Sequence, residues 1–298
     1  MIRNFEEVIK RAEDLGPKRG AIFYPHEEDV ILSIAEATSR GYIEPLLIGD
    51  REKIKSQLRE VGLSGNGLQI IQQKDPQEAS DLCVRLVMEG KADFIIKGNV
   101  ITTYLYRSLI KVTSSLDISL VPSTLCFHEV AGVDHLFVIT DPGVNIAPDL
   151  DTKVKIIRNA VAVLQKVGYQ SPRVMILSGA RAIDQGLPSL QEALIIKEMA
   201  KGGELGECTI EDFHNLVDLL NHPSKGFPDI LLVPQIEAGN ILVKAIDHLG
   251  IGKRQCVTVG AGIIALTPSR SDDHEVRLLN IALGVLLSGV AREDKIDH

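Results

Sequence analysis

The chain has 298 residues, of which 45% are hydrophobic and 24% are charged. This is the composition of an ordinary globular protein, and the length favours two lobes over one. The formal net charge of −8 argues against broad nucleic-acid binding, which needs a basic face. An acidic chain can still bind an anionic small molecule where local donors outweigh the general field.

The amino-terminal residues MIRNFEE are acidic and lack an apolar core, so we expect no signal peptide. The longest apolar run, 281–287, is too short to span a bilayer. The cysteines form no C-x-x-C pair and the histidines show no metal-ligand spacing. We therefore expect a cytoplasmic protein that has no metal and no membrane partner.

Strands and helices alternate through the first part of the chain. Asn4 can cap a first helix that Gly16 closes, and Pro76 is placed at a helix start, where its missing N–H costs nothing. The apolar pattern further predicts strands over 21–24, 45–48, 68–71 and 93–96, and helices over 26–39, 51–61, 76–90 and 102–111.

The alternation is interrupted between residues 118 and 140, where the pattern favours consecutive strands with no helix between them. We interpret this interruption as the crossing into a second lobe. Alternation then resumes, with helices predicted over 152–167, 189–200, 210–220 and 272–290, and strands over 174–177, 230–233, 257–259 and 263–266.

This order of elements predicts an α/β fold with mostly parallel sheets covered by helices on both faces. The last helix is apolar on most sides, so it should be central. It can pack against the first lobe only if the chain returns there. We therefore predict a discontinuous first domain, residues 1–127 plus 257–298, and a second domain, residues 128–256.

Residues 229–240 read DILLVPQIEAGN and form the most informative stretch of the chain. Four apolar residues predict a buried strand, which Pro234 ends. Small residues then open an amphipathic helix. Such a turn between a parallel strand and a helix is either an ordinary connection or a place where α/β proteins bind anions and small molecules.

Four segments of this kind follow predicted strands, over residues 95–99, 140–149, 236–240 and 266–273. Open α/β sheets place their binding sites at the carboxyl ends of strands. The four segments could therefore share one cleft, or they could be four separate turns.

Ser269 and Arg270 stand at the head of the last predicted helix, a position suited to a phosphate or a developing oxyanion. Asp272 or Asp273 could act as a base, or either could complement the dipole of the helix. Lys97 could bind phosphate or be solvated at the end of its strand.

Taken together and in order, these segments resemble the phosphate acetyltransferase and phosphate butyryltransferase family, and its butyryl branch most closely. The resemblance covers almost the whole chain. It is carried by YPHEEDV at 24–30, PLLIGD at 45–50, ADFIIKG at 92–98, TD at 140–141, NIAPD at 145–149, the stretch 229–240, TPSRSD at 267–272 and NIAL at 280–283.

The resemblance implies two α/β domains related to the isocitrate and isopropylmalate dehydrogenase fold, and a homodimer. It implies reversible transfer of an acyl group between coenzyme A and phosphate, by direct attack of the thiol on the acyl phosphate. Coenzyme A is then a substrate, and no cofactor is expected.

By position, the resemblance implies that Ser269 and Arg270 bind phosphate and stabilise the transition state, and that Asp272 helps to deprotonate the thiol. The residues that it implies for substrate binding are Lys97, Gly98, Asn99, Asp141, Asn145, Glu237, Gly239 and Asn240.

The sequence departs from the family pattern at three places. Asp117 stands where an arginine is usual, and Thr124 where a histidine is usual. Residues 207–212 lack a D-G-P turn. Two hypotheses follow: an active acyltransferase, or a weak or inactive paralogue that binds a coenzyme A-type ligand or a protein partner. A metal-dependent dehydrogenase is not favoured, because no carboxylate cluster for a divalent cation is evident.

Overall fold

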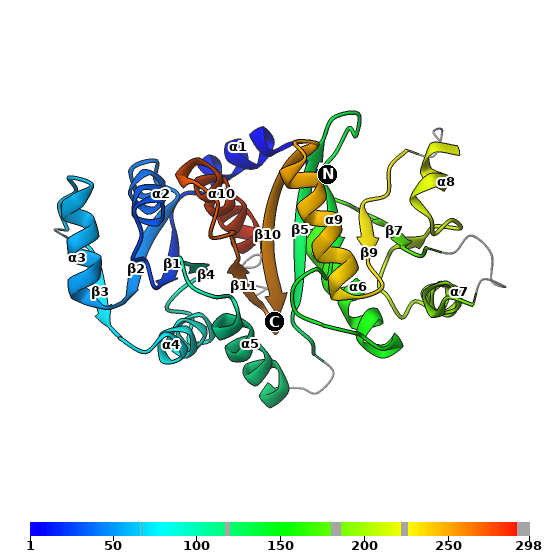
Figure 1. Cartoon of the computed structure of the whole chain (residues 1–298), viewed down its shortest axis with the longest axis horizontal. Coiled ribbons are helices and arrows are strands. Elements are labelled where there is room, and N and C mark those ends of the chain that lie inside the picture. Colours follow the sequence, from blue (N-terminus) through cyan, green and yellow to red (C-terminus); the bar gives the residue numbers. More distant parts are fainter. Residues whose placement is uncertain (66, 117–119, 180–185, 222–225, 291–298) are drawn as a thin grey trace. The chain divides into compact units, whose positions relative to one another are not determined.

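A computed structural model describes residues 1–65, 67–116, 120–179, 186–221 and 226–290 (Figure 1). The chain forms two compact units. Unit 1 comprises residues 1–5 and 123–254, and unit 2 comprises residues 6–122 and 255–298. The domain boundaries expected from the sequence, at 127/128 and 256/257, stay a prediction.

The sheet of unit 2 has the strand order β3-β2-β1-β4-β11-β10. Its first five strands pair in parallel, and β10 pairs with β11 in antiparallel fashion. The order reverses between β1 and β4, and such a reversal is where open α/β sheets bind ligands. The strands are β1 (Lys18–Phe23), β2 (Ile43–Gly49), β3 (Gln69–Gln72), β4 (Phe94–Lys97), β10 (Gly252–Gly260, of which residues 252–254 are counted with unit 1) and β11 (Ile263–Leu266).

Helices cover both faces of this sheet, as the alternating pattern predicts. Figure 1 shows α2 and α10 above the strands β1 and β4, and α4 and α5 below them. Asp75 caps α4 by accepting a hydrogen bond from the N–H of Glu78, and Pro76 follows at the first helical position. The helices are α1 (Phe5–Leu15), α2 (Glu28–Ser39), α3 (Arg51–Glu60), α4 (Pro76–Met88), α5 (Thr103–Leu116) and α10 (His274–Val290).

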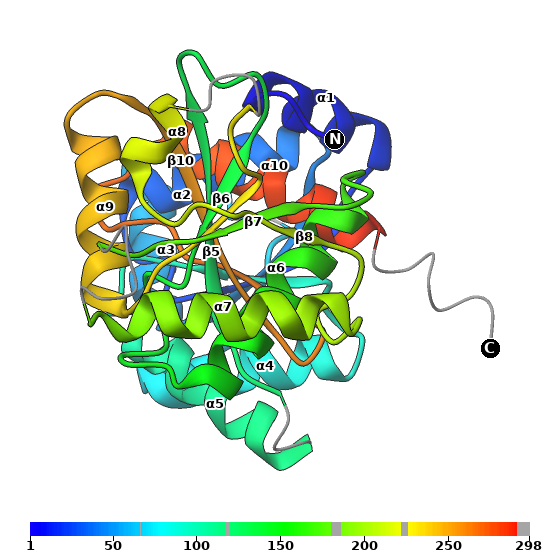
Figure 2. The ribbon, with the colours of Figure 1, turned by 90° about the vertical axis from the view of Figure 1, so that its right-hand side faces the viewer.

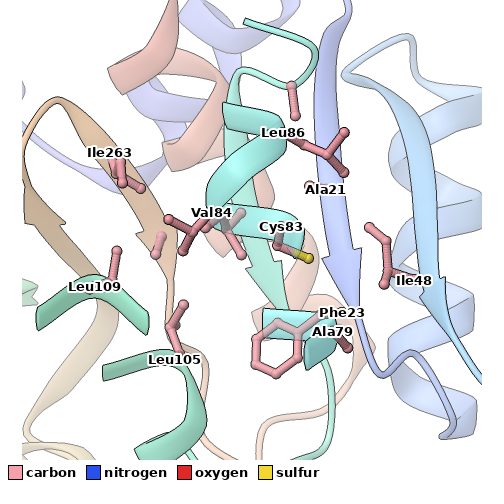
Figure 3. Close-up of a cluster of buried hydrophobic side chains, with 13 residues drawn as sticks. Ala21, Phe23, Ile48, Ala79, Cys83, Val84, Leu86, Leu105, Leu109 and Ile263 are labelled. Carbon is pink, nitrogen blue, oxygen red and sulfur yellow. The ribbon is translucent and has the colours of Figure 1, made fainter. Parts of the chain in front are cut away.

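The core under α4 shows why the strands of unit 2 are apolar on both sides (Figure 3). Ala21 and Phe23 of β1 contact one cluster with Cys83 and Val84 of α4. Ile22, between them in the sequence, points to the opposite face because side chains alternate along a strand. A strand covered by helices on both faces therefore needs a continuous apolar run.

Unit 1 has a five-stranded sheet in the order β5-β6-β9-β7-β8. All neighbours are parallel except β5 and β6, which confirms the consecutive strands predicted before residue 140. The strands are β5 (Ser123–Val130), β6 (Phe137–Thr140), β7 (Arg173–Ile176), β8 (Thr209–Ile210) and β9 (Ile230–Leu232).

The helices of unit 1 are α6 (Leu150–Lys166), α7 (Pro188–Lys201), α8 (Leu216–Asn221) and α9 (Ile236–His248). Figure 2 shows α7 running across the view below β7 and β8. The predicted helix over 210–220 is wrong in its first half. Thr209 and Ile210 extend the sheet instead, and Glu211 pairs with Arg173, the first residue of β7. Within the described ranges, no helix has both the length and the apolar character needed to cross a bilayer.

The substitution Gly284→Ala should destabilise unit 2. A Cβ at this position of α10 would lie 2.9 Å from the side chains of Leu266 and Phe94. Overpacking of this kind costs about 1–3 kcal/mol, which exceeds the gain in helix propensity. Urea unfolding would measure the loss. Met88→Ala, at a residue 44% exposed, is the control and should change stability by less than about 0.5 kcal/mol. Equal stability of both variants would contradict the packing described for α10.

Candidate functional site

The turn from Ser269 to Asp272 joins β11 to α10 and carries the predicted catalytic residues. The N–H of Ser269 donates to Oδ2 of Asp272 at 2.7 Å, and the N–H of Asp272 donates to the carbonyl of Ser269 at 3.3 Å. The hydroxyl groups of Ser269 and Ser271 lie 2.9 Å apart. Arg270 is exposed between them, so its guanidinium is open to a ligand.

The two aspartates that follow Arg270 have different partners. Asp273 caps α10, because its Oδ1 accepts a hydrogen bond of 2.9 Å from the N–H of Val276. Asp272 is half-buried and its carboxylate closes the turn on Ser269. The sequence left open which aspartate complements the helix. The geometry assigns that role to Asp273.

Lys97 ends β4 and is 1% exposed. Its Nζ donates to the carbonyls of Gly98 and Val100, each at 3.1 Å. The pKa of Lys97 is lowered to about 8, mainly by burial and next by the charges of Arg277 and Arg270, and the carboxylate of Asp272 opposes the shift. Lys97 is therefore no solvated strand end, and it is electrostatically coupled to the Ser269–Asp272 turn.

Gly98 allows a close approach between the ends of β4 and β1. A Cβ at Gly98 would lie 2.1 Å from the carbonyl oxygen of Tyr24, so no larger residue fits. Tyr24 itself has φ of 60°, a left-handed conformation that costs a non-glycine residue about 1–3 kcal/mol. Asn99 is half-buried in the same turn. The switch point of this sheet is thus lined by Tyr24, Lys97, Gly98 and Asn99.

Arg277 is a residue of this region that the sequence reasoning missed. It lies in α10 and is 4% exposed. Its Nε donates to the carbonyl of Asp272 and its Nη2 to that of Ser269, each at 2.9 Å. Burial lowers the pKa of Arg277, and the carboxylates of Asp272, Asp29, Glu27 and Asp273 act against that shift. The signal in the sequence was a charged residue near the start of a largely apolar helix.

In unit 1, Asp141 organises the loop that follows β6. The side chain is 3% exposed. Its carboxylate accepts hydrogen bonds of 2.6–3.1 Å from the N–H groups of Thr124, Gly143, Val144 and Asn145 and from the side-chain amide of Asn145. Burial raises the pKa of Asp141 and these bonds oppose the rise. The carboxylate of Asp141 therefore holds the loop in shape. Its oxygens are occupied by these bonds, so a ligand would contact other groups of the loop.

Gly239 brings the first turn of α9 against this loop. A Cβ at Gly239 would lie 2.7 Å from the side chain of Val233 and 3.0 Å from Cα of Pro142. The N–H of Ile236 donates to the carbonyl of Ile146 at 3.1 Å, which fixes the start of the helix. Glu237 and Asn240 are exposed in the same turn. Asp141, Asn145, Glu237, Gly239 and Asn240 thus belong to one end of unit 1.

The structure describes two of the three places where the sequence departs from the family pattern. Asp117 lies outside the described residues. Thr124 is 3% exposed, and its backbone N–H holds Asp141 at 3.0 Å. Residues 209 and 210 form β8, and Asp212 pairs with Lys197. A cleft shared by the two units stays a prediction.

The substitution Asp141→Asn should loosen the loop after β6. An amide nitrogen would face N–H donors, and bonds to a charged acceptor would be lost, for a cost on the order of 3 kcal/mol. Urea unfolding and proteolysis of the loop would measure the effect. The control is Asp151→Asn, because Asp151 is 73% exposed. Wild-type stability of Asp141→Asn would show that the carboxylate does not organise the loop.

Geometry and fold together define a class: an α/β protein with strand-end turns suited to an anionic substrate. Residues 73–206 match the family model described as Phosphate acetyl/butaryl transferase. The chain is 28% identical over 299 residues to the phosphate butyryltransferase of Clostridium acetobutylicum, covering 97% of this chain and 99% of the relative. It is 30% identical over 294 residues to the probable phosphate butyryltransferase of Bacillus subtilis, covering 95% and 97%. The chain therefore belongs to the phosphate acetyltransferase and phosphate butyryltransferase family.

Solved structures agree with the fold. A phosphotransacetylase from Streptococcus pyogenes superposes with a TM-score of 0.78 at 16% identity, covering 97% of this chain and 99% of the other. A 4-hydroxythreonine-4-phosphate dehydrogenase from Klebsiella pneumoniae superposes with a TM-score of 0.60 at 15% identity, covering 91% and 100%. These likenesses concern the fold alone, and they agree with the α/β fold that the sequence predicts.

Proposed function

We propose that the protein is a phosphate acyltransferase that moves an acyl group of the acetyl or butyryl class between coenzyme A and phosphate. Membership of the family supports the reaction. The observation that best supports the location of the site is the exposure of Arg270. This residue lies on a turn that is coupled electrostatically to the buried cation of Lys97.

The reaction needs no covalent bond to the protein. The sulfur of coenzyme A forms a bond to the carbonyl carbon of the acyl phosphate, and the carbonyl oxygen takes up negative charge. The carbon–oxygen bond to phosphate then breaks and inorganic phosphate leaves, while the thiol proton passes to a base. In the proposal Asp272 is that base.

Arg270 has the chemistry to stabilise the charge that develops in this reaction. Its planar guanidinium presents paired donors to the phosphate or to the oxyanion. Ser269 can donate its hydroxyl beside it. The ammonium of Lys97 adds positive charge from within the fold. Preorganised donors of this kind supply a large part of catalysis in acyl transfer.

In unit 1, we assign the 141–145 loop and the first turn of α9 to substrate binding. Exposed Glu237 and Asn240, and half-buried Asn145, present polar groups there. We assign them to substrate binding, with coenzyme A and acyl phosphate as the substrates and with no cofactor. On the basis of the family resemblance we further propose a homodimer in the cytoplasm.

The first test follows thiol release from butyryl-coenzyme A in the presence of phosphate. The wild-type protein should release coenzyme A, and Arg270→Ala should lower kcat/KM by about 10²–10³-fold. Arg59→Ala removes an exposed arginine from α3 and should leave the rate unchanged. An absence of release with several acyl-coenzyme A esters, together with measurable coenzyme A binding, would favour the inactive paralogue. An active Arg270→Ala variant would refute the site.

A second test separates function from stability at Lys97. Because the buried ammonium is costly, Lys97→Met should keep the stability of the wild type at pH 7, or exceed it by on the order of 1 kcal/mol, while lowering kcat/KM. Since folding lowers the pKa of Lys97 to about 8, the unfolded chain binds more protons above that pH. Relative to the variant, the wild type should therefore gain stability between pH 8 and about pH 10.4.

Thermal unfolding across this pH range, paired with the thiol assay, would measure both effects. Lys91→Met is the control, since Lys91 lies just before β4 and its side chain is 65% exposed. A Lys97→Met variant that is strongly destabilised but fully active would contradict the proposal.

A further inference from the structure

Arg277 touches both ends of the turn that carries Ser269 and Arg270. The residue lies at the fourth position of α10, eight residues after Ser269. Its fork spans the turn, because Nε binds the carbonyl of Asp272 and Nη2 the carbonyl of Ser269, each at 2.9 Å. Two donors held in one rigid plane fix the relative orientation of the two carbonyls.

The charges around Arg277 come from three elements. Asp272 and Asp273 lie on its own segment, and Glu27 and Asp29 lie at the start of α2, which packs against α10. Lys97, at the end of β4, feels the charge of Arg277. Arg277 is thus a buried cation whose hydrogen bonds go to backbone carbonyls of the turn and whose charge reaches Lys97.

We propose that Arg277 is a positioning residue, which clamps the Ser269–Asp272 turn so that Arg270 is aimed at the anionic substrate. The inference rests on the proposed function for what the turn does, and it adds a residue that contacts no substrate. The structural reason for an arginine is the two-carbonyl clamp. A lysine is a flexible point charge and cannot hold both carbonyls in one plane.

The charge of Arg277 has a second consequence. Burial is the main reason that the pKa of Lys97 is about 8, and Arg277 is the next cause, ahead of Arg270. Removing the charge at position 277 should therefore raise the pKa of Lys97. A residue that only filled space in the core would have no such effect.

Two substitutions separate the clamp from the charge. Arg277→Lys keeps the charge and loses the rigid fork, whereas Arg277→Met loses both. A misplaced catalytic group commonly costs about 10²-fold, so both variants should lose kcat on that order. At pH 7, where Lys97 is protonated, the KM for phosphate should rise by a similar factor in both variants, because Arg270 is no longer aimed at the anion in either.

The pH dependence of the KM for phosphate is the readout that a purely structural role would not move. In the wild type this KM should rise as Lys97 loses its proton near pH 8. In Arg277→Met the midpoint of the rise should move to higher pH. In Arg277→Lys it should stay within a few tenths of a unit of the wild type, because the charge remains.

Arg254→Met is the matched control. Arg254 is 9% exposed and pairs with Asp247 in unit 1, so its loss tests the general effect of removing a buried arginine. This variant should lower the melting temperature without moving the midpoint. If Arg277→Met does not fold, a loss of kcat with an unmoved midpoint in Arg277→Lys still supports the clamp.

Wild-type kcat in Arg277→Lys would overturn the clamp, and an unmoved midpoint in folded Arg277→Met would overturn the link to Lys97. If the wild type releases no thiol, the proposed function fails by itself. Calorimetric titration with inorganic phosphate from pH 7 to pH 9.5 then tests Arg277. The midpoint at which affinity falls should still be higher in Arg277→Met, and identical midpoints would refute the inference.

Discussion

Repulsion among three cations is the constraint on which the candidate site of unit 2 depends. Lys97 and Arg277 are both buried, and the charges of Arg277 and Arg270 lower the pKa of Lys97. Hydrogen bonds to backbone carbonyls hold these charges near one another. Lys97 donates to the carbonyls of Gly98 and Val100, and Arg277 donates to those of Ser269 and Asp272. In the proposed function, a bound phosphate dianion would relieve part of this repulsion.

The turn gains its shape from the same bonds. Ser269 and Asp272 are tied to each other and to Arg277, which leaves Arg270 as the exposed cation of the group. Asp273 caps α10 by accepting a hydrogen bond from the N–H of Val276. Preorganisation of this kind lowers the reorganisation needed when charge develops in a transition state. In unit 1 a negative charge organises a loop in the same way. The buried carboxylate of Asp141 accepts hydrogen bonds from backbone N–H groups and so fixes the shape of the loop.

The sequence predicted the parts of this account that depend on periodicity. Short apolar runs predicted the strands, and the positions just after strand ends predicted the segments that hold Lys97, Asp141, Gly239 and Ser269. The start of the helix predicted over 210–220 is wrong, because Ile210 and the preceding Thr209 pair with β7, a tertiary contact that the local pattern does not reveal. Arg277 was missed for a related reason. A lone charge in a largely apolar helix has no periodic signature, and its partners are backbone carbonyls, which the sequence does not distinguish.

The roles of Asp272 and Asp273 show the same limit at one turn. Both follow Arg270 and both are acids near a helix start, so their order in the chain cannot separate a cap from a group that closes a turn. The hydrogen bonds distinguish the two roles, because Asp272 accepts from Ser269 within the turn and Asp273 accepts from Val276 in the helix. Likewise, Asp141 gave the signal of a polar residue at a strand end, whereas its five donors identify it as the centre of the loop.

In the proposed function, the strand-end turn of unit 2 is an anion site organised around Arg270. Calorimetric titration of the wild type and of Arg270→Ala with inorganic phosphate at pH 7 and two ionic strengths tests it most directly. We expect one phosphate per chain in the wild type, weaker binding at the higher salt concentration, and loss of binding in Arg270→Ala. Equal affinity in both proteins would contradict it.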